Sequence, residues 1–312
     1  MPRIVFGKNQ NVRTSTFYRP DLHNELKRIA LLQSNGFKCP TICLGSRVAT
    51  VNIETATVYL EDGTRLKADL LIGADGERSV VKAAFSDPET LRMAPYRIFR
   101  AIIPTEELLS NDKSKALLTL TKGSFAMFPH GDRTLSWFEG RDGLLQDLDL
   151  GYLLRPGDEP RGERDPSRAR EKMLERFRDF HPDIVDVLRK TDMVADYEVY
   201  FNKPLLHLFK GKAVLIGDAA HSMFPTTGQG GSQSMEDAGA LGSILSHLPS
   251  SSSLPERLRI FGKLRKERTA TVQMLSGLIF GQEEGWVRRR PEHFIQRTGV
   301  RSGEDHLELL YK

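Results

Sequence analysis

The sequence is poor in features that mark several classes of protein. Cys39 and Cys43 are its only cysteines, and with no second pair they argue against a four-ligand zinc site. We expect both thiols to be reduced. No apolar run approaches the roughly 18 residues of a membrane-spanning helix, and the first twenty residues contain no secretory apolar segment. We therefore expect a cytoplasmic protein without a membrane span.

The charge pattern argues against a nucleic-acid partner. The net charge is +4, but lysines and arginines are dispersed and do not gather with aromatic residues into a basic patch. Hydrophobic residues make up 39% of the 312 residues and charged residues 28%, as in ordinary globular proteins. The composition is thus that of an ordinary folded protein, and the charge pattern predicts no nucleic-acid partner.

The absence of one nucleotide-binding motif is more informative. No G-x-G-x-x-G loop, the usual first half of a dinucleotide site, follows a predicted strand. A segment typical of the second half is nevertheless present at residues 211–241, GKAVLIGDAAHSMFPTTGQGGSQSMEDAGAL. It predicts a buried strand over 212–217, a turn, a glycine loop and the start of a helix.

Asp218 follows the predicted strand directly, and ligands bind at the carboxyl ends of parallel strands. Its carboxylate could accept hydrogen bonds from ribose or ribitol hydroxyls, or it could cap the next turn. Beyond it, Pro225, Gly228, Gly230 and Gly231 leave a loop with few side chains before the helix. Backbone amides there can face an anionic ring edge, whereas the alternative is a flexible linker. For nearby His221 we expect a structural hydrogen bond.

Two further positions are candidates for the same kind of site. Asp75 and Gly76 follow a second apolar segment, ADLLIGA, although Asp-Gly alone is only a turn signal. Arg19 precedes a helix that Pro20 and Asp21 favour, where a guanidinium would suit a pyrophosphate. The alternative for Arg19 is an ordinary surface arginine.

Hydrophobic periodicity predicts the remaining elements. We expect helices over 167–180 and 254–280, strands over 48–53 and 57–60, and a strand buried on both faces ending the segment 65–75. Short alternating segments at 96–103, 116–121, 124–128 and 134–138 predict an antiparallel sheet. If that sheet faces inward, its pocket is lined by Phe99, Ile102, Met127, Phe128 and Trp137.

These segments predict an α/β fold, a doubly wound nucleotide-binding domain interrupted by an antiparallel-sheet insert.

The chain resembles the FAD-dependent aromatic hydroxylases of the group A flavoprotein monooxygenases, most nearly the fungal salicylate hydroxylase-like branch. Four segments carry the resemblance: YRPDLHNELKRIA (18–30), ADLLIGADGERSVVK (68–82), the 211–241 segment, and, more weakly, FGKLRKERTATVQMLS (261–276). The family has an asparagine in the glycine loop where this chain has Gly231-Ser232.

The resemblance implies that the doubly wound domain binds FAD and NAD(P), that it is shortened at its N-terminus, and that the sheet insert is the substrate domain. We accordingly divide the sequence into a partial FAD-binding domain (1–92), a sheet insert (93–204), a return to the FAD-binding domain (205–250) and a C-terminal helical segment (251–312).

The resemblance implies that NAD(P)H reduces FAD and that the reduced flavin uses O₂ to hydroxylate a small aromatic or phenolic substrate, as in fungal secondary metabolism. It assigns Arg19 and Asp218 to the pyrophosphate and ribitol, Gly230 and Gly231 to the isoalloxazine ring, and Asp75-Gly76 to the pyrophosphate region. Arg100 is where a substrate-anchoring arginine would lie. Without the G-x-G-x-x-G unit we expect weak or no FAD binding, and the alternative is a non-oxidative relative, either a cofactor-free catalyst or a binding partner.

Overall fold

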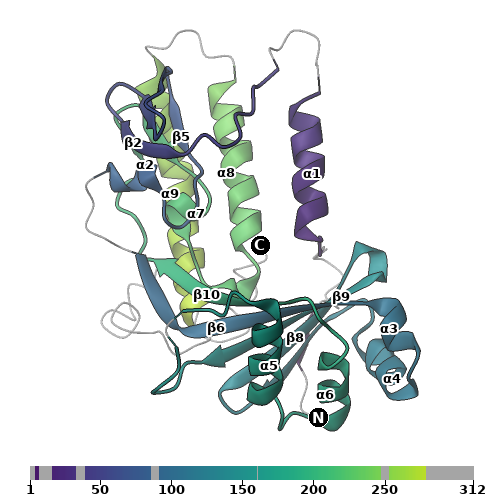
Figure 1. Cartoon of the computed structure of the whole chain (residues 1–312). Helices are drawn as coiled ribbons and strands as arrows, with labels where there is room; N and C mark the ends of the chain where they lie inside the picture. Colours follow the sequence, from purple (N-terminus) through teal and green to yellow (C-terminus); the bar gives the residue numbers. More distant parts are fainter. Residues whose placement is uncertain are drawn as a thin grey trace. The chain divides into compact units, whose positions relative to one another are not determined.

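A computed structural model of the chain describes residues 4–6, 16–32, 39–85, 91–159, 161–246 and 253–278. Its contacts divide the chain into two compact units (Figure 1). The first unit comprises Met1–Ile42 and Ala94–Val199, and the second comprises Cys43–Met93 and Tyr200–Lys312. Our four-part division of the sequence remains a prediction.

A six-stranded sheet organises the first unit, with strand order β1-β7-β8-β9-β6-β10. Its strands are β1 (Ile4–Phe6), β6 (Leu91–Pro104), β7 (Phe125–His130), β8 (Arg133–Gly140), β9 (Leu145–Leu153) and β10 (Val194–Asn202). The pairs β1–β7, β7–β8, β8–β9 and β6–β9 are antiparallel, as the alternating pattern predicted.

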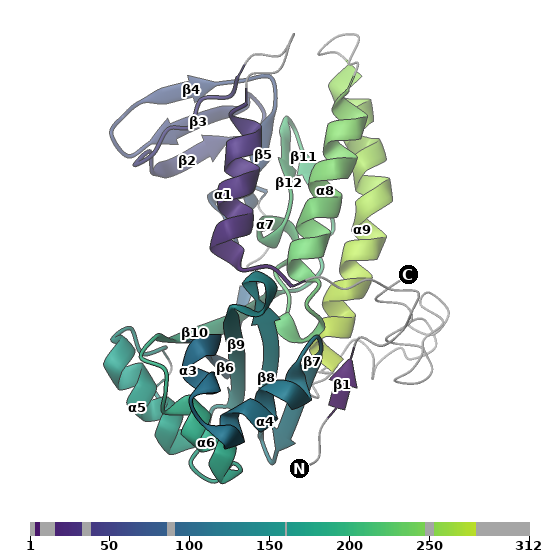
Figure 2. The ribbon, with the colours of Figure 1, turned by 90° about the vertical axis from the view of Figure 1, so that its right-hand side faces the viewer.

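One face of this sheet forms the core of the unit. Buried side chains such as Phe99, Trp137 and Leu150 alternate along β6, β8 and β9 with half-buried ones. Four helices pack on that face (Figure 2): α3 (Thr105–Leu109), α4 (Asp112–Thr121), α5 (Pro166–Arg176) and α6 (Pro182–Leu188). A 3₁₀ turn, η1 (Arg141–Gly143), joins β8 to β9.

Two predictions for this unit are wrong. Residues 116–121 were expected to form a strand, but they belong to α4, where Leu117, Leu118 and Thr121 are buried at helical spacing. The five predicted pocket residues do not share a face. Phe99, Phe128 and Trp137 fill the core, whereas Ile102 and Met127 occupy the opposite, half-buried positions. Side chains of a strand alternate between faces, so these two sets cannot line one cavity.

Helix α1 (Arg19–Ala30) begins where the sequence predicted and is held at its first turn. The Arg141 guanidinium donates to both oxygens of Asp21, at 2.6 and 2.7 Å, and lies over the Tyr18 ring. None of its residues is buried, and Leu26 and Ile29 are about half exposed. Leu22 is half-buried, so the apolar side of α1 is mostly exposed.

The second unit contains two three-stranded sheets. One has the order β11-β12-β5, formed by Phe209–Lys210, Ala213–Leu215 and Leu71–Gly73, and the other is a meander of β2 (Val48–Asn52), β3 (Thr57–Leu60) and β4 (Arg65–Lys67). The helical elements are α2 (Val80–Ala83), α7 (Asp218–His221), η2 (Pro225–Thr227), α8 (Gly230–Leu245) and α9 (Leu254–Leu278). Helices α8 and α9 lie side by side (Figures 1 and 2).

Strand β12 is fully buried, as predicted, whereas β5 is not. Ile72 is 44% exposed because β5 lies at the edge of its sheet among the described residues, so the expectation of a strand buried on both faces is wrong. The α/β class with an antiparallel-sheet insert is confirmed. No helix in the described ranges is long and apolar enough to cross a bilayer. The segment after Gly281 lies outside the described residues.

Candidate functional site

The candidate site begins where two neighbouring parallel strands of the second unit end. Strand β12 pairs in parallel with β5, Leu215 opposite Gly73, and the Ile216 amide continues the ladder to the Gly73 carbonyl at 3.0 Å. A Cβ on Gly73 would lie 2.7 Å from the Leu215 side chain, so only glycine fits there. Asp75 and Asp218 follow these strands and therefore both lie at the carboxyl end of this sheet.

Asp218 is exposed and opens the short helix α7 after Gly217. Its carboxylate makes no hydrogen bond or ion pair with the described residues, so the alternative that it caps the turn finds no contact to support it. Gly217 is buried with φ +58° and ψ −146°, a conformation that favours glycine. This backbone turn presents the Asp218 carboxylate to solvent at the sheet edge.

The glycine loop leads into α8 without a side-chain cap. Pro225 begins the 3₁₀ turn η2, Gly228 ends it in the left-handed region at φ +63°, and Gln229 precedes the helix with no capping side-chain bond. A Cβ at Gly230 or Gly231 would meet nothing within 4 Å. No contact in the described chain therefore requires glycine at these two positions. Gly230 is half-buried and Gly231 is exposed, so the first turn of α8 is open to solvent.

A buried network holds this turn from behind. The Asp237 carboxylate, 1% exposed, accepts the Gly217 amide at 2.9 Å and Arg265 Nε at 2.7 Å, and lies 2.6 Å from His221 Nε2. Burial alone would raise the pKa of Asp237, but the hydrogen bond and charge of His221, with the Gly217 amide and Arg265, hold it below its usual value. His221 is thus a structural partner, as predicted.

Arg265 extends the network across the α8–α9 contact. It donates to Glu236 at 2.5 Å and to the Gln233 side chain at 2.7 Å, while Arg268 binds both Glu236 oxygens. The sequence prediction named none of these four residues as site residues. The signals that could have found them are the two motifs that contain them, 211–241 with Gln233 and Glu236, and 261–276 with both arginines.

Asp75 and Gly76 perform local structural tasks. Asp75 accepts Ser79 Oγ at 2.5 Å and the Val80 amide at 2.7 Å, so both carboxylate oxygens are engaged in starting α2. Gly76 has φ +82°, which the turn requires. Arg78 nearby donates to Tyr200 Oη at 2.9 Å and stacks on that ring. The prediction that Asp75 and Gly76 contact a cofactor remains a prediction.

The two predicted arginines lie in the first unit. Arg19 opens α1 and is exposed. Arg100, on β6, donates from Nε and Nη2 to the two oxygens of Asp149, at 2.7 and 2.8 Å, and lies 3.5 Å from Asp147. The bond to Asp149 raises the pKa of Arg100. Roles for both arginines in binding remain predictions.

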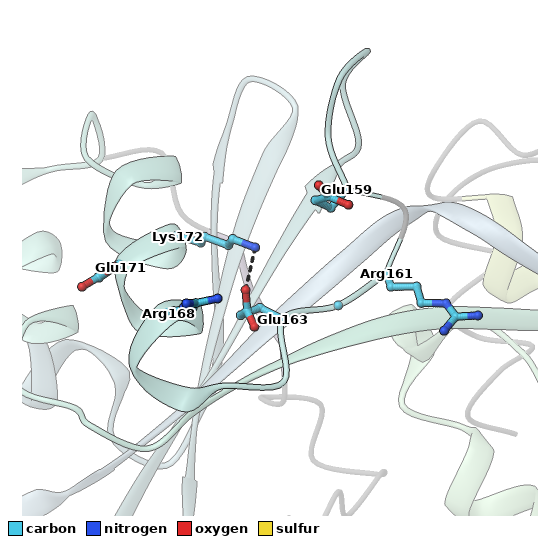
Figure 3. Close-up of a pocket in the computed structure, with 7 residues that line it drawn as sticks. Glu159, Arg161, Glu163, Arg168, Glu171 and Lys172 are labelled. Atoms are coloured by element: carbon cyan, nitrogen blue, oxygen red, sulfur yellow. Dashed lines mark hydrogen bonds and ion pairs between the residues drawn. The ribbon is translucent and has the colours of Figure 1, made fainter.

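A polar depression also lies in the first unit (Figure 3), lined by Glu159, Arg161, Gly162, Glu163, Arg168, Glu171 and Lys172. Lys172 donates to Glu163 at 2.9 Å across it. Beneath it Arg97 pairs with Asp196 as a buried ion pair. The charges in the depression are mixed, with three acidic and three basic side chains, and none of its residues was predicted to bind a ligand.

The second unit fits a flavin adenine dinucleotide on its own observations. An exposed carboxylate without a partner at a strand end suits ribitol hydroxyls, and amides at an uncapped helix start that is open to solvent suit an electron-rich ring edge. The open space over Gly230 and Gly231 leaves room for a planar ring to approach the backbone. These features define an α/β protein of the flavin-binding class.

The comparison with family models agrees with this assignment to the flavin-binding class. Residues 46–276 match the FAD binding domain family, and the chain belongs to that family. The predicted resemblance to group A flavoprotein monooxygenases is thereby confirmed.

Among curated proteins, the chain is 27% identical to the FAD-dependent monooxygenase phomE' of Diaporthe leptostromiformis, covering 83% of this chain and 66% of that protein. It is 30% identical to hispidin-3-hydroxylase of Neonothopanus nambi, covering 82% and 63%. Among solved structures, a salicylate hydroxylase substrate complex is 25% identical, with a TM-score of 0.66 and coverage of 94% and 70%. The chain spans 66% of the length of phomE' and 63% of that of hispidin-3-hydroxylase, about two thirds of each relative or less.

Proposed function

We propose that the chain functions as an FAD-dependent monooxygenase that hydroxylates a small aromatic or phenolic molecule, with NAD(P)H as reductant and O₂ as oxidant. The observation that carries this proposal is the turn at Gly217-Asp218, followed by the uncapped start of α8. The names of the relatives support it, since hispidin-3-hydroxylase and phomE' are both named for this kind of reaction.

In this proposal the residues of the second unit bind and orient the cofactor. Asp218 accepts hydrogen bonds from ribitol hydroxyls, and the amides of Gly230 and Gly231 stabilise negative charge at the ring edge. Asp237 keeps the turn rigid through the Gly217 amide. Bound FAD would supply the electron transfer and oxygen activation that no side chain of this site can perform. Arg19, Asp75 and Gly76 remain candidates for the pyrophosphate region.

FAD titration of the purified chain tests this assignment. We expect saturable quenching of flavin fluorescence, with weak affinity, and at least tenfold weaker binding in Asp218→Ala and Gly231→Val. Gly239→Ala is the matched control, because it lies on the same helix and a Cβ there meets nothing within 4 Å. Equal affinities in all four proteins would place any bound FAD elsewhere.

The reaction is tested separately. With FAD and NADH or NADPH, we expect substrate-dependent nicotinamide oxidation and a product heavier by one oxygen atom, labelled from ¹⁸O₂. FAD binding without any product from a panel of phenols would contradict the proposed reaction while the cofactor assignment stands. Failure to bind FAD at all would refute the cofactor assignment and favour the alternative, a non-oxidative relative that has lost FAD binding.

A further inference from the structure

Helix α9 contains two buried polar residues to which the proposed function assigns no role. Gln273 is 7% exposed and Ser276 is fully buried. They lie three residues apart, on the same side of the helix, at the end of the 261–276 motif. Burying a polar side chain is unfavourable unless it is hydrogen-bonded, so the partners of these two residues indicate what they do.

Both residues bind the segment that leads from α7 into η2 and the glycine loop. Gln273 Nε2 donates to the Ser222 carbonyl at 3.2 Å. Ser276 Oγ accepts the Phe224 amide at 3.2 Å and donates to the Gln273 carbonyl at 2.7 Å. The Thr226 hydroxyl donates to the Ser276 carbonyl at 2.7 Å. Every second residue at the start of this segment is therefore hydrogen-bonded to α9.

The start of the segment is also held from a second side. Gln273 Nε2 lies 3.3 Å from the Asn202 carbonyl, to which it donates, and the Asn202 amide donates to the Ser222 carbonyl at 3.0 Å. The Ser222 hydroxyl in turn donates to the Tyr200 carbonyl at 3.0 Å. Ser222 therefore cannot shift without breaking several buried hydrogen bonds together.

The residues expected to meet the cofactor lie between and after these attachment points. Pro225, Gly228 and Gly231 are exposed. Phe224 and Thr227 are buried. The segment thus has an inner side bound to α9 and an outer side open to solvent. Because Pro225 lies between two attached residues and peptide units are planar, the attachment to α9 determines where the outer side lies.

We propose that Gln273, Ser276 and Thr226 are positioning residues for the flavin. They act through the backbone, by holding the segment before the glycine loop so that its outer side and the first turn of α8 are arranged before FAD binds. The proposal rests on the proposed function, because it explains how the same site is preorganised. Asp237 has a different task, since it holds the Gly217 turn at the other end of this stretch.

Amide hydrogen exchange, measured by NMR on the full chain without FAD, tests whether α9 holds the segment. Gln273→Met keeps the length of the side chain but cannot donate, and Thr226→Val keeps its shape but lacks the hydroxyl. In both variants we expect exchange at the Phe224 and Gly228 amides to accelerate about three- to tenfold, the equivalent of one hydrogen bond. Thr226→Ser restores the hydroxyl and should exchange like the wild-type protein. Unchanged exchange in both variants would overturn the proposal.

FAD titration of the same variants tests the consequence for the flavin. We expect Gln273→Met and Thr226→Val to bind FAD about three- to tenfold more weakly and to shift the visible absorption bands of the bound flavin. Thr226→Ser should restore both. A residue that only stabilised the fold would leave the spectrum of bound flavin unchanged.

Thr269→Val is the matched control. It makes the same substitution on α9, but the Thr269 hydroxyl donates to the Arg265 carbonyl of its own helix at 3.0 Å. We expect wild-type exchange at Phe224 and wild-type FAD affinity in this variant. Equal effects of Thr269→Val and Thr226→Val, or no recovery in Thr226→Ser, would refute the positioning role.

The outcomes distinguish this proposal from the proposed function. If the wild-type chain binds FAD and the variants match it in affinity and spectrum, the positioning role fails while the cofactor assignment stands. If the wild-type chain does not bind FAD, the proposed function fails and the role for the flavin fails with it. Circular dichroism and thermal melts establish that the compared proteins are folded. Thr226 is only half-buried, so its two variants decide the question even if Gln273→Met does not fold.

Discussion

Asp237 should be among the most sensitive positions of the second unit. Its buried carboxylate forms hydrogen bonds with the Gly217 amide, the His221 ring and the Arg265 guanidinium. Asp237→Ala leaves Arg265, only 5% exposed, with Glu236 as its remaining carboxylate partner. Removing one member of a buried ion pair reduces the free energy of unfolding by about 3–5 kcal/mol.

The Gly217 amide also loses its acceptor, and an unsatisfied buried donor destabilises by about 1–3 kcal/mol. These two effects belong to one network and are not additive. Glu236 also still neutralises part of the Arg265 charge. We therefore expect a total loss of about 4 kcal/mol for Asp237→Ala and of about 2 kcal/mol for Asp237→Asn, which keeps the shape of the side chain.

Urea unfolding monitored by circular dichroism measures these losses, and hydrogen exchange at the Gly217 amide localises them. Asp186→Ala is the control, because Asp186 pairs with Arg189 on the surface of α6 and such pairs contribute about 0–1 kcal/mol. If Asp237→Ala unfolds within about 1 kcal/mol of this control, or leaves exchange at Gly217 unchanged, the network does not hold the turn.

The pH dependence gives an independent check with a defined sign. The folded protein lowers the pKa of Asp237, so its stabilisation is complete above the ordinary aspartate pKa of about 4 and is lost as the pH falls through the lower folded value. The difference in unfolding free energy between the wild-type protein and Asp237→Asn should therefore shrink below about pH 4. A difference that grows on acidification would contradict the assignment.

Other predictions concern packing and the buried pair of the first unit. Gly73→Ala should destabilise by about 1–3 kcal/mol, because its Cβ would overlap two side chains, whereas Gly239→Ala, in open space on α8, should be neutral or stabilising in the same urea assay. Arg97→Met should reduce the unfolding free energy by about 3–5 kcal/mol, since Asp196 would remain buried and unpaired. Arg28→Met removes only an exposed pair, so an equal effect there would refute this reasoning.

The parts of the site that are formed by residues adjacent in the sequence could be predicted from it. An apolar run ending in Gly217-Asp218 and a glycine loop before a helix are short-range patterns, and they form β12 and the start of α8 as expected, while the predicted turn is the short helix α7. The support of that turn could not be predicted in the same way. Asp237 and Arg265 are 28 residues apart on different helices, and no periodicity links a buried aspartate to one arginine among many.

The sheet illustrates a second limit of sequence patterns. Alternation itself places Phe99 and Ile102, three residues apart on β6, on opposite faces, so the assignment of both to one pocket did not follow the pattern. What alternation does not indicate is which of the two faces the helices cover. The role of Arg100 depends on the same missing information. Its partner Asp149 is 49 residues away, and only the register of β6 with β9 brings the two together. An arginine that suggests an anion site in sequence can thus be, in the folded sheet, one member of a cluster with the opposite net charge.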